Sequence, residues 1–248
     1  MLIMSCTFLF GTPGLQTHTM PVRHEKWTIV LQRYVDDGLV DYDGIGKDSL
    51  FFQYLRTLAD TNPDSLPSRE ERLAFWLNAY NAYTIKLILD RMPLESITDI
   101  SLGLPVLFGP WSIDVANVAG TVYTLNDIEH DIIRAQYRDP RVHCALVCAS
   151  KGCPKLRPEA YEGATLHALL DDDTQRFIGD PSRNGFYPAR KTIAISKIFD
   201  WYESDFEEAA GSVKEFIARY APSEYRSLIA SPDCDVEFLD YDWRLNKK

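Results

Sequence analysis

The sequence predicts an α+β protein: a helix-rich single domain packed on a small, mainly antiparallel sheet. Segments with helical periodicity outnumber those with strand periodicity, and most of them come first in the chain. The 248 residues are 46% hydrophobic and 12% aromatic, which can fill one sizeable core without a disulfide or metal staple. There is no internal repeat or low-complexity tract. A single domain is therefore predicted over residues 23–248.

The first 22 residues are predicted to be a leader or a disordered segment. The run from Leu2 to Phe10 is mostly apolar, but it is far too short to span a bilayer. No Lys or Arg precedes Arg23, so the basic start of a signal peptide is missing. We expect a soluble protein with no integral membrane segment. Its compartment stays open between the cytoplasm and an exported, periplasmic or cell-envelope location.

The excess of acidic over basic side chains limits the kinds of molecule that the protein is expected to bind. The chain has 26 basic and 36 acidic side chains, a formal net charge of −10, and no basic stripe with interleaved aromatic residues. Contacts to nucleic-acid phosphates come mainly from Lys and Arg, so no nucleic-acid partner is predicted. A small-molecule or peptide ligand is compatible with this composition. The sequence indicates no oligomeric state.

Amphipathic helices fill the first part of the predicted domain. They are expected at residues 26–40, 48–59 and 68–91. The first should end at the pair Asp37-Gly38. Ser68 can cap the third, because Glu71 follows at capping-box spacing, and this helix must end before Pro93.

The second part of the domain is predicted to mix short strands with helices. Strands are expected as a hairpin within 111–124 and as segments 142–148, 192–195 and 239–245. Helices are expected from residue 125, over 159–177 and over 199–220. The last strand rests on a strict alternation of apolar and charged residues, and the last helix should break near Gly211.

Two asparagines interrupt the most apolar helix. The segment from Leu73 to Leu89 is apolar on nearly every face, so it should be buried. Asn78 and Asn81 are three residues apart and hence share one face. A buried carboxamide needs partners for its donors and acceptor. Two interpretations stay open: both amides bond neighbouring backbone, or one of them orients a catalytic group or binds a ligand.

A carboxylate interrupts the apolar face of the helix that starts at residue 125. Glu129 stands where the helical spacing calls for an apolar residue, and burying a carboxylate is costly unless it is paired. A partner such as His143, Arg134 or Arg141 is therefore predicted, for a catalytic or a purely structural pair. His130 is either a surface residue or part of the same cluster.

The segment from Arg141 to Pro154 holds three candidate catalytic residues close together in sequence. His143 paired with Glu129 would suit a general base. Cys148 ends the predicted strand at a loop, and its spacing to Cys153 lets the two sulfurs approach. Along an extended strand, however, five steps of about 3.3 Å separate the Cα atoms of His143 and Cys148 by roughly 16 Å. His143 could then serve Cys148 only if the chain bends, and otherwise His130 or another residue would be the base.

Three functions stay open at this point. The first is a thiol-dependent hydrolase or acyl transferase with Cys148 as nucleophile and a His/Glu pair. The second is a non-catalytic ligand-binding or scaffold domain. The third is a structural or redox disulfide between Cys148 and Cys153, although their spacing is not Cys-x-x-Cys. The five cysteines lack zinc-ligand spacing, so no metal and no cofactor are predicted.

Five blocks of sequence together resemble the domain-of-unknown-function family 547. They are FWLNAYNA at 75–82, LNDIEH at 125–130, DPRVHCALVCASKGCP at 139–154, SKIFDWYESDF at 196–206 and DYDWRLN at 240–246. The resemblance covers residues 26–246 and implies little about activity. It suggests bacterial proteins that often carry export signals, and a fold related to papain-like or transglutaminase-like thiol enzymes. The family usually has an apolar residue such as Phe at the position of Cys144, which is therefore predicted to be core.

Overall fold

The computed structural model describes residues 23–100 and 109–248, so the predicted leader lies outside the described residues. Its α-helices are α1 Glu25–Tyr34, α2 Tyr42–Ile45, α3 Ser49–Asp60, α4 Arg69–Arg91, α5 Ala135–Tyr137, α6 Leu166–Gly179, α7 Ile198–Trp201, α8 Glu203–Ala210, α9 Val213–Tyr220 and α10 Arg226–Ile229. A π-helix spans Asp127–Arg134, and a 3₁₀-helix spans Pro140–Cys144. Shorter 3₁₀ turns lie at Pro63–Ser65, Ile97–Asp99, Pro110–Ser112, Gly163–Thr165, Pro188–Arg190 and Ser223–Tyr225. The predicted helix-rich α+β class is confirmed.

The strands form three small sheets. They are β1 Val35–Asp36, β2 Leu39–Val40, β3 Ala116–Val118, β4 Thr121–Tyr123, β5 Gly185–Tyr187, β6 Thr192–Ile195 and β7 Asp235–Phe238. The pairs β1–β2, β3–β4 and β5–β6 are antiparallel, as predicted, whereas β6–β7 is parallel. The hairpin within 111–124 and the strand at 192–195 are thereby confirmed.

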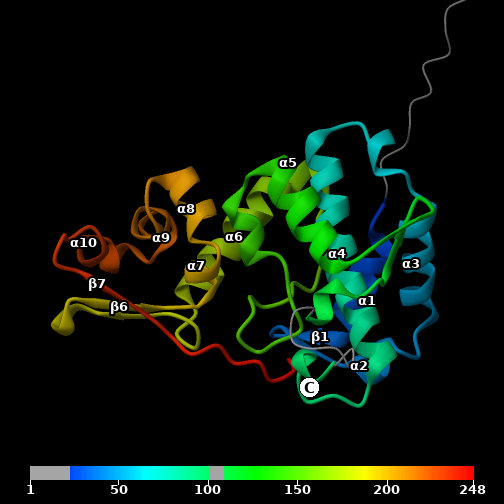
Figure 1. Cartoon of the computed structure of the whole chain (residues 1–248), viewed down its shortest axis with the longest axis horizontal. Helices are drawn as coiled ribbons and strands as arrows, with labels where there is room; N and C mark the ends of the chain where they lie inside the picture. Colours follow the sequence, from blue (N-terminus) through cyan, green and yellow to red (C-terminus); the bar gives the residue numbers. More distant parts are fainter. Residues whose placement is uncertain (1–22, 101–108) are drawn as a thin grey trace, which may run out of the picture.

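Two hydrophobic clusters organise these elements. One contains α1, α3 and α4, and the other contains β6, α8 and α9. In Figure 1 they lie in the right and left halves of the view, with α6 between them. The C-terminal segment, in red, runs from β7 back to the first cluster beside β1 and α2. There the Val40 N–H donates to the Asn246 carbonyl at 2.8 Å, which ties the end of the chain to its beginning.

The helix α4 has the predicted bounds and cap. Ser68 Oγ accepts the Glu71 N–H at 3.0 Å, so it satisfies one of the free donors of the first turn. The helix ends at Arg91, before Pro93. Nearly every side chain from Leu73 to Ile88 is buried. The apolar periodicity therefore predicted correctly that this helix forms the centre of the first cluster.

The first predicted helix is shorter than expected. It ends at Tyr34, because residues 35–40 form the β1–β2 hairpin. Asp37 and Gly38 are its turn, with φ of 47° and 81°, as in the turns that suit two-residue hairpins. A Cβ on Gly38 would also lie 2.7 Å from Lys155 Cβ, so both the positive φ and this close approach require glycine.

Two other predicted elements are wrong in their extent. Residues 159–165 do not belong to α6, because their backbone groups bond elsewhere: the Ala160 N–H donates to Thr28 Oγ1 and the Tyr161 N–H to Asn78 Oδ1. The predicted strand at 239–245 is an extended segment with only isolated bridges, to Ser96 and Ser150. Its backbone bonds go to several segments in turn, so no ladder can form. Among the described residues, no helix is both long and apolar enough to cross a bilayer.

One buried histidine predicts a pH dependence of stability. His24 is fully buried, its Nδ1 lies 2.7 Å from Tyr54 Oη, and burial lowers its pKa from 6.5 to about 4. Between these values the unfolded chain holds a proton that the folded chain does not. Stability should therefore be complete above pH 6.5 and fall by about 3 kcal/mol as the pH drops to 4. Urea denaturation of wild type and His24→Asn across this range tests this, and an identical pH slope in the two proteins would contradict it.

Candidate functional site

A cavity of about 310 Å³ is lined by residues of both hydrophobic clusters. Five of the seven candidate residues from the sequence line it: Glu129, His130, His143, Cys148 and Cys153. Most of its remaining wall is aromatic, formed by Tyr80, Trp111, Trp201, Tyr202, Tyr241 and Trp243. Apolar walls with a few convergent polar groups are typical of small-molecule sites.

The backbone that carries His143 and Cys148 is coiled, so the predicted strand at 142–148 is wrong. Pro140 sits at the start of the 3₁₀-helix, where its fixed φ and missing N–H are tolerated. Asp139 caps this helix by accepting the Arg141 N–H at 3.1 Å. Because the chain is wound here, the separation of roughly 16 Å expected for a strand does not apply. His143 and Cys148 instead line the same cavity.

The side chains of the two helix asparagines bind backbone groups. Asn81 donates to the Ala145 carbonyl at 3.0 Å and accepts the Val147 N–H at 2.9 Å. Asn78 makes the same pair of bonds to the backbone of Tyr161, at 2.8 and 3.0 Å. Each side-chain amide thus makes the two backbone hydrogen bonds that a neighbouring strand would make to a regular strand. Asn81 positions the segment that leads into Cys148, and neither amide lines the cavity.

His143 pairs with Asp205, so the predicted pairing with Glu129 is wrong. Its Nε2 lies 2.7 Å from Asp205 Oδ2, and its ring stacks on Tyr202 with centroids 3.8 Å apart. A carboxylate acceptor requires the hydrogen on Nε2, which leaves Nδ1 of the neutral ring as a proton acceptor. Within the described residues, Nδ1 has no hydrogen-bond partner at this site. Asp205 therefore holds the His143 ring in the orientation and tautomer of a general base.

Arg134 binds the carboxylate that pairs with His143. Its Nε and Nη2 donate to the two oxygens of Asp205 at 2.7 and 2.8 Å, and its Nη1 contacts His130 Nδ1 at 2.9 Å. Burial alone would raise the pKa of Asp205, but the bonds from His143 and Arg134 hold it well below its usual value. Asp205 is therefore a carboxylate at neutral pH, and His130 joins the cluster through Arg134.

Glu129 is buried, as predicted, but its hydrogen-bond partner is a phenol. It is 6% exposed, and its Oε1 accepts the Tyr202 hydroxyl at 2.5 Å. Burial together with Glu129 raises the pKa of both Tyr80 and Tyr202. Arg141, one of the predicted partners, binds Asp139 and Asp171 instead. Glu129 lies on the π-helix, a widened geometry that is frequent at functional sites.

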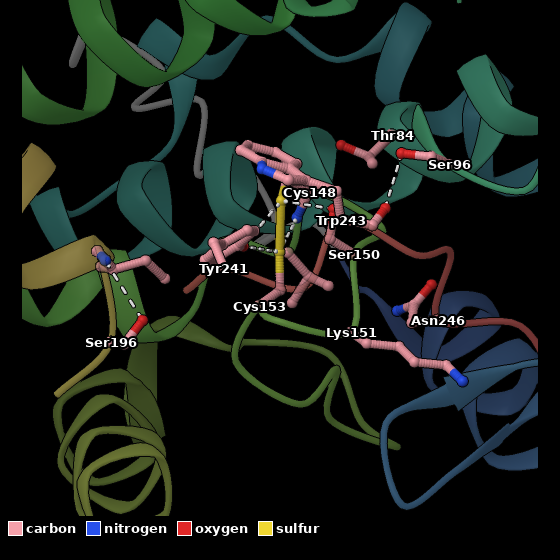
Figure 2. Close-up of a disulfide and its surroundings, with 12 residues drawn as sticks. Thr84, Ser96, Cys148, Ser150, Lys151, Cys153, Ser196, Tyr241, Trp243 and Asn246 are labelled. Atoms are coloured by element: carbon pink, nitrogen blue, oxygen red, sulfur yellow. Dashed lines mark hydrogen bonds between the residues drawn. A yellow bond between two sulfur atoms is a disulfide. The ribbon is translucent and has the colours of Figure 1, made fainter. Parts of the chain in front are cut away.

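Cys148 and Cys153 form a disulfide in the wall of the cavity, with Cα atoms 6.3 Å apart. Cys148 is half-buried and Cys153 is buried. Cys153 Sγ accepts the Cys148 N–H at 3.0 Å and the Tyr241 hydroxyl at 3.1 Å. Figure 2 shows Tyr241 beside the disulfide and the Trp243 ring close to Cys148, whereas Lys151 points away from both sulfurs. Lys151 therefore cannot activate either thiol.

The backbone after Cys148 is strained. Ala149 has φ of 65°, in the left-handed region that non-glycine residues rarely adopt. It is held there because its carbonyl accepts the Asn246 N–H at 2.9 Å, so the C-terminal segment fixes the loop. Strain that the surroundings enforce is often found at functional sites. Among the described residues, no group of three or more His, Cys, Asp or Glu side chains could hold a metal ion.

The comparisons with known proteins identify the family alone. A family model described as "Protein of unknown function, DUF547" matches residues 63–178, about half of the chain. The chain belongs to the DUF547 family. No curated protein and no solved structure gives a significant match. The DUF547 match contains α4, the π-helix and the Cys148–Cys153 loop, and it is shorter than the resemblance over 26–246.

Five of the fourteen residues that line the cavity lie outside the DUF547 match, among them Tyr241 and Trp243. Asp205, the partner of the lining residue His143, also lies outside it. None of these three residues was among the candidates from sequence. Asp205 had one signal, because it directly precedes the fully buried Phe206 within the block 196–206 that resembles the family. Cys144, predicted to be core, is confirmed: it is 1% exposed, and burial raises the pKa of its thiol.

Proposed function

We propose that this protein is a thiol-dependent hydrolase or acyl transferase, with Cys148 as the nucleophile and His143 as the general base. One observation carries the proposal: Cys148 and His143 line a single cavity of ligand size, and His143 is paired there with Asp205. A cysteine, a histidine and a carboxylate that orients the histidine are the parts of an activated thiol nucleophile. The carboxylate is Asp205, in place of the Glu129 expected from the sequence.

The chemistry assigns one task to each group. Nδ1 of His143 takes the proton of the Cys148 thiol, and the thiolate attacks the carbonyl carbon of the substrate. The imidazolium, stabilised by Asp205, then protonates the leaving group, which departs and leaves a thioester on Cys148. Water or an acceptor nucleophile, deprotonated by His143, releases the acyl group. The Asn126 amide lines the cavity, and its second N–H, beside the one that it gives to Ser112 Oγ, is a donor to the acyl oxygen.

The disulfide makes this activity conditional. Cys148 cannot attack a substrate while it is bonded to Cys153. A dithiol reductant exchanges with the disulfide, closes to its own cyclic disulfide and leaves Cys148 and Cys153 as thiols. Acyl transfer should therefore require prior reduction of the protein.

The hydrogen bonds to Cys153 favour a second candidate, thiol–disulfide exchange. A substrate thiolate would attack the more accessible Cys148, and Cys153 would leave as a thiolate. Its Sγ already accepts two donors, the Cys148 N–H and the Tyr241 hydroxyl, which would stabilise that leaving group. A second substrate thiol would then release the mixed disulfide, so that two thiols are oxidised and the protein is reduced. A low-molecular-weight disulfide would restore the starting state.

Acetylation by p-nitrophenyl acetate separates the two candidates. Reduced wild type should release nitrophenol in a burst and gain one acetyl group on Cys148, at least about tenfold faster than a free thiol of ordinary pKa. The oxidised wild type should not react. Cys153→Ser should react without any reductant, because nothing masks Cys148. Intact and peptide mass spectrometry measure the product, and His143→Gln should slow it about a hundredfold.

Two outcomes decide against acyl transfer. If neither reduced wild type nor Cys153→Ser is acetylated at Cys148, the acyl-transfer proposal fails. If Cys153→Ser instead accumulates a mixed disulfide with a thiol-disulfide probe, and only wild type turns that probe over, exchange is the better description. Cys234→Ser is the matched control, because Cys234 belongs to the second cluster and lies outside the cavity. This variant should behave as wild type in both assays.

A further inference from the structure

Glu129 is a buried carboxylate that makes no ion pair among the described residues. Its Oε1 accepts the Tyr202 hydroxyl. In the part of the chain that the structure describes, no Lys, Arg or His nitrogen lies within 4.0 Å of it. Arg134 interacts with Glu129 electrostatically from beyond that distance, but its guanidinium binds both oxygens of Asp205, the carboxylate that His143 also contacts. A buried carboxylate is costly unless a positive charge compensates it, and Glu129 faces the cavity.

The rest of the cavity wall attracts cations through the faces of its aromatic rings. Three of the chain's five tryptophans, Trp111, Trp201 and Trp243, line it, and none of the described Lys or Arg side chains does. Indole faces carry the strongest attraction for an organic cation among the aromatic side chains. Arg134 lies over the Tyr202 ring, 5.0 Å from its centroid. Among the described residues, no protein cation lies over any of the three indoles.

We propose that the cavity binds its substrate through an organic cation, an ammonium or quaternary ammonium group held between Glu129 and the indoles of Trp111, Trp201 and Trp243. This inference rests on the proposed function, because it assigns the substrate class of the same site. The cavity of about 310 Å³ is at the small end of ligand pockets, which favours a small molecule. A bare metal ion does not fit, because no metal-ligating cluster occurs among the described residues.

The formal charge of the ligand is tested by two probes of the same shape, choline and its neutral isostere 3,3-dimethylbutanol. Binding is measured in Cys148→Ser, so that the result does not depend on catalysis, by calorimetry and by tryptophan fluorescence. Choline should bind at least about tenfold more tightly than the isostere. Glu129→Gln keeps an acceptor for Tyr202 but removes the charge, so it should weaken choline binding about tenfold and leave the isostere unchanged.

Two further variants control for structural effects. Glu207→Gln removes the same charge from an exposed position on α8 and should change neither affinity. Trp201→Leu alters a side chain that is 45% exposed, so folding should tolerate it, while choline binding should weaken more than isostere binding. Equal affinities for the two probes, tighter binding of the isostere, or no saturable binding of choline would each overturn the inference. None of these outcomes bears on the acetylation of Cys148, so the two proposals fail separately.

Discussion

Replacing Arg157 by methionine should lower the free energy of unfolding by about 4 kcal/mol. Arg157 is 7% exposed, and its Nη1 lies 2.7 Å from both Asp172 and Asp173. The Asp173 side chain is only 2% exposed and also accepts the Tyr161 hydroxyl at 2.7 Å. Removing the guanidinium leaves that carboxylate buried with Arg176 as its sole remaining cation among the described residues. Breaking a buried pair costs far more than its net contribution to stability.

The pH dependence of this loss has a definite sign. Burial raises the pKa of Asp173 above its usual value, although the Arg157 guanidinium opposes this. Without Arg157 the pKa should rise further, so the folded variant should take up a proton more readily than the unfolded chain. The destabilisation should therefore be largest at neutral pH and shrink as the pH falls. Urea denaturation at several pH values measures it.

An exposed ion pair provides the control for Arg157→Met. Arg190 pairs with Glu237 at 3.0 Å, but both side chains are more than half exposed. Arg190→Met should change stability little, because solvent screens such pairs. Equal losses in the two variants would show that burial does not govern the effect and would contradict the prediction.

Replacing Asn81 by alanine should also cost about 4 kcal/mol, because it leaves two buried backbone groups without partners, the Ala145 carbonyl and the Val147 N–H. It should have a second effect that a purely structural residue would not produce. The segment that Asn81 holds leads directly into Cys148, so the reduced variant should acetylate Cys148 at least about tenfold more slowly at a temperature where it is folded.

Asn78 is the matched control on the same helix. It makes the same pair of bonds, but to Tyr161, which lies away from the cavity. Asn78→Ala should lose a similar free energy of unfolding and keep the wild-type acetylation rate. Slower acetylation in both variants would point to general loosening of the fold. Unchanged rates in both would show that Asn81 does not position Cys148.

Local signals in the sequence were sufficient for several parts of the site. The capping spacing of Ser68 and Glu71 and the apolar run after them predicted α4 with its correct ends. The same periodicity identified Asn78 and Asn81 as buried amides and Glu129 as a buried acid. These features depend on neighbours within one or two helical turns, so the residues themselves specify them. Membership of the DUF547 family was also readable from the order of the blocks.

Contacts between distant segments decided the rest. Asp205 meets His143 across 62 residues, and Tyr241 meets Cys148 across 93, and no periodicity reports such pairs. The run at 142–148 has the composition of a buried strand, yet Asn81 supplies its hydrogen bonds in place of a neighbouring strand, so it coils. Local patterns thus specified the central helix α4 and the polar residues buried on it and on the π-helix. Which of these side chains meet in the site depends on how the two hydrophobic clusters pack around the cavity, and no local pattern carries that information.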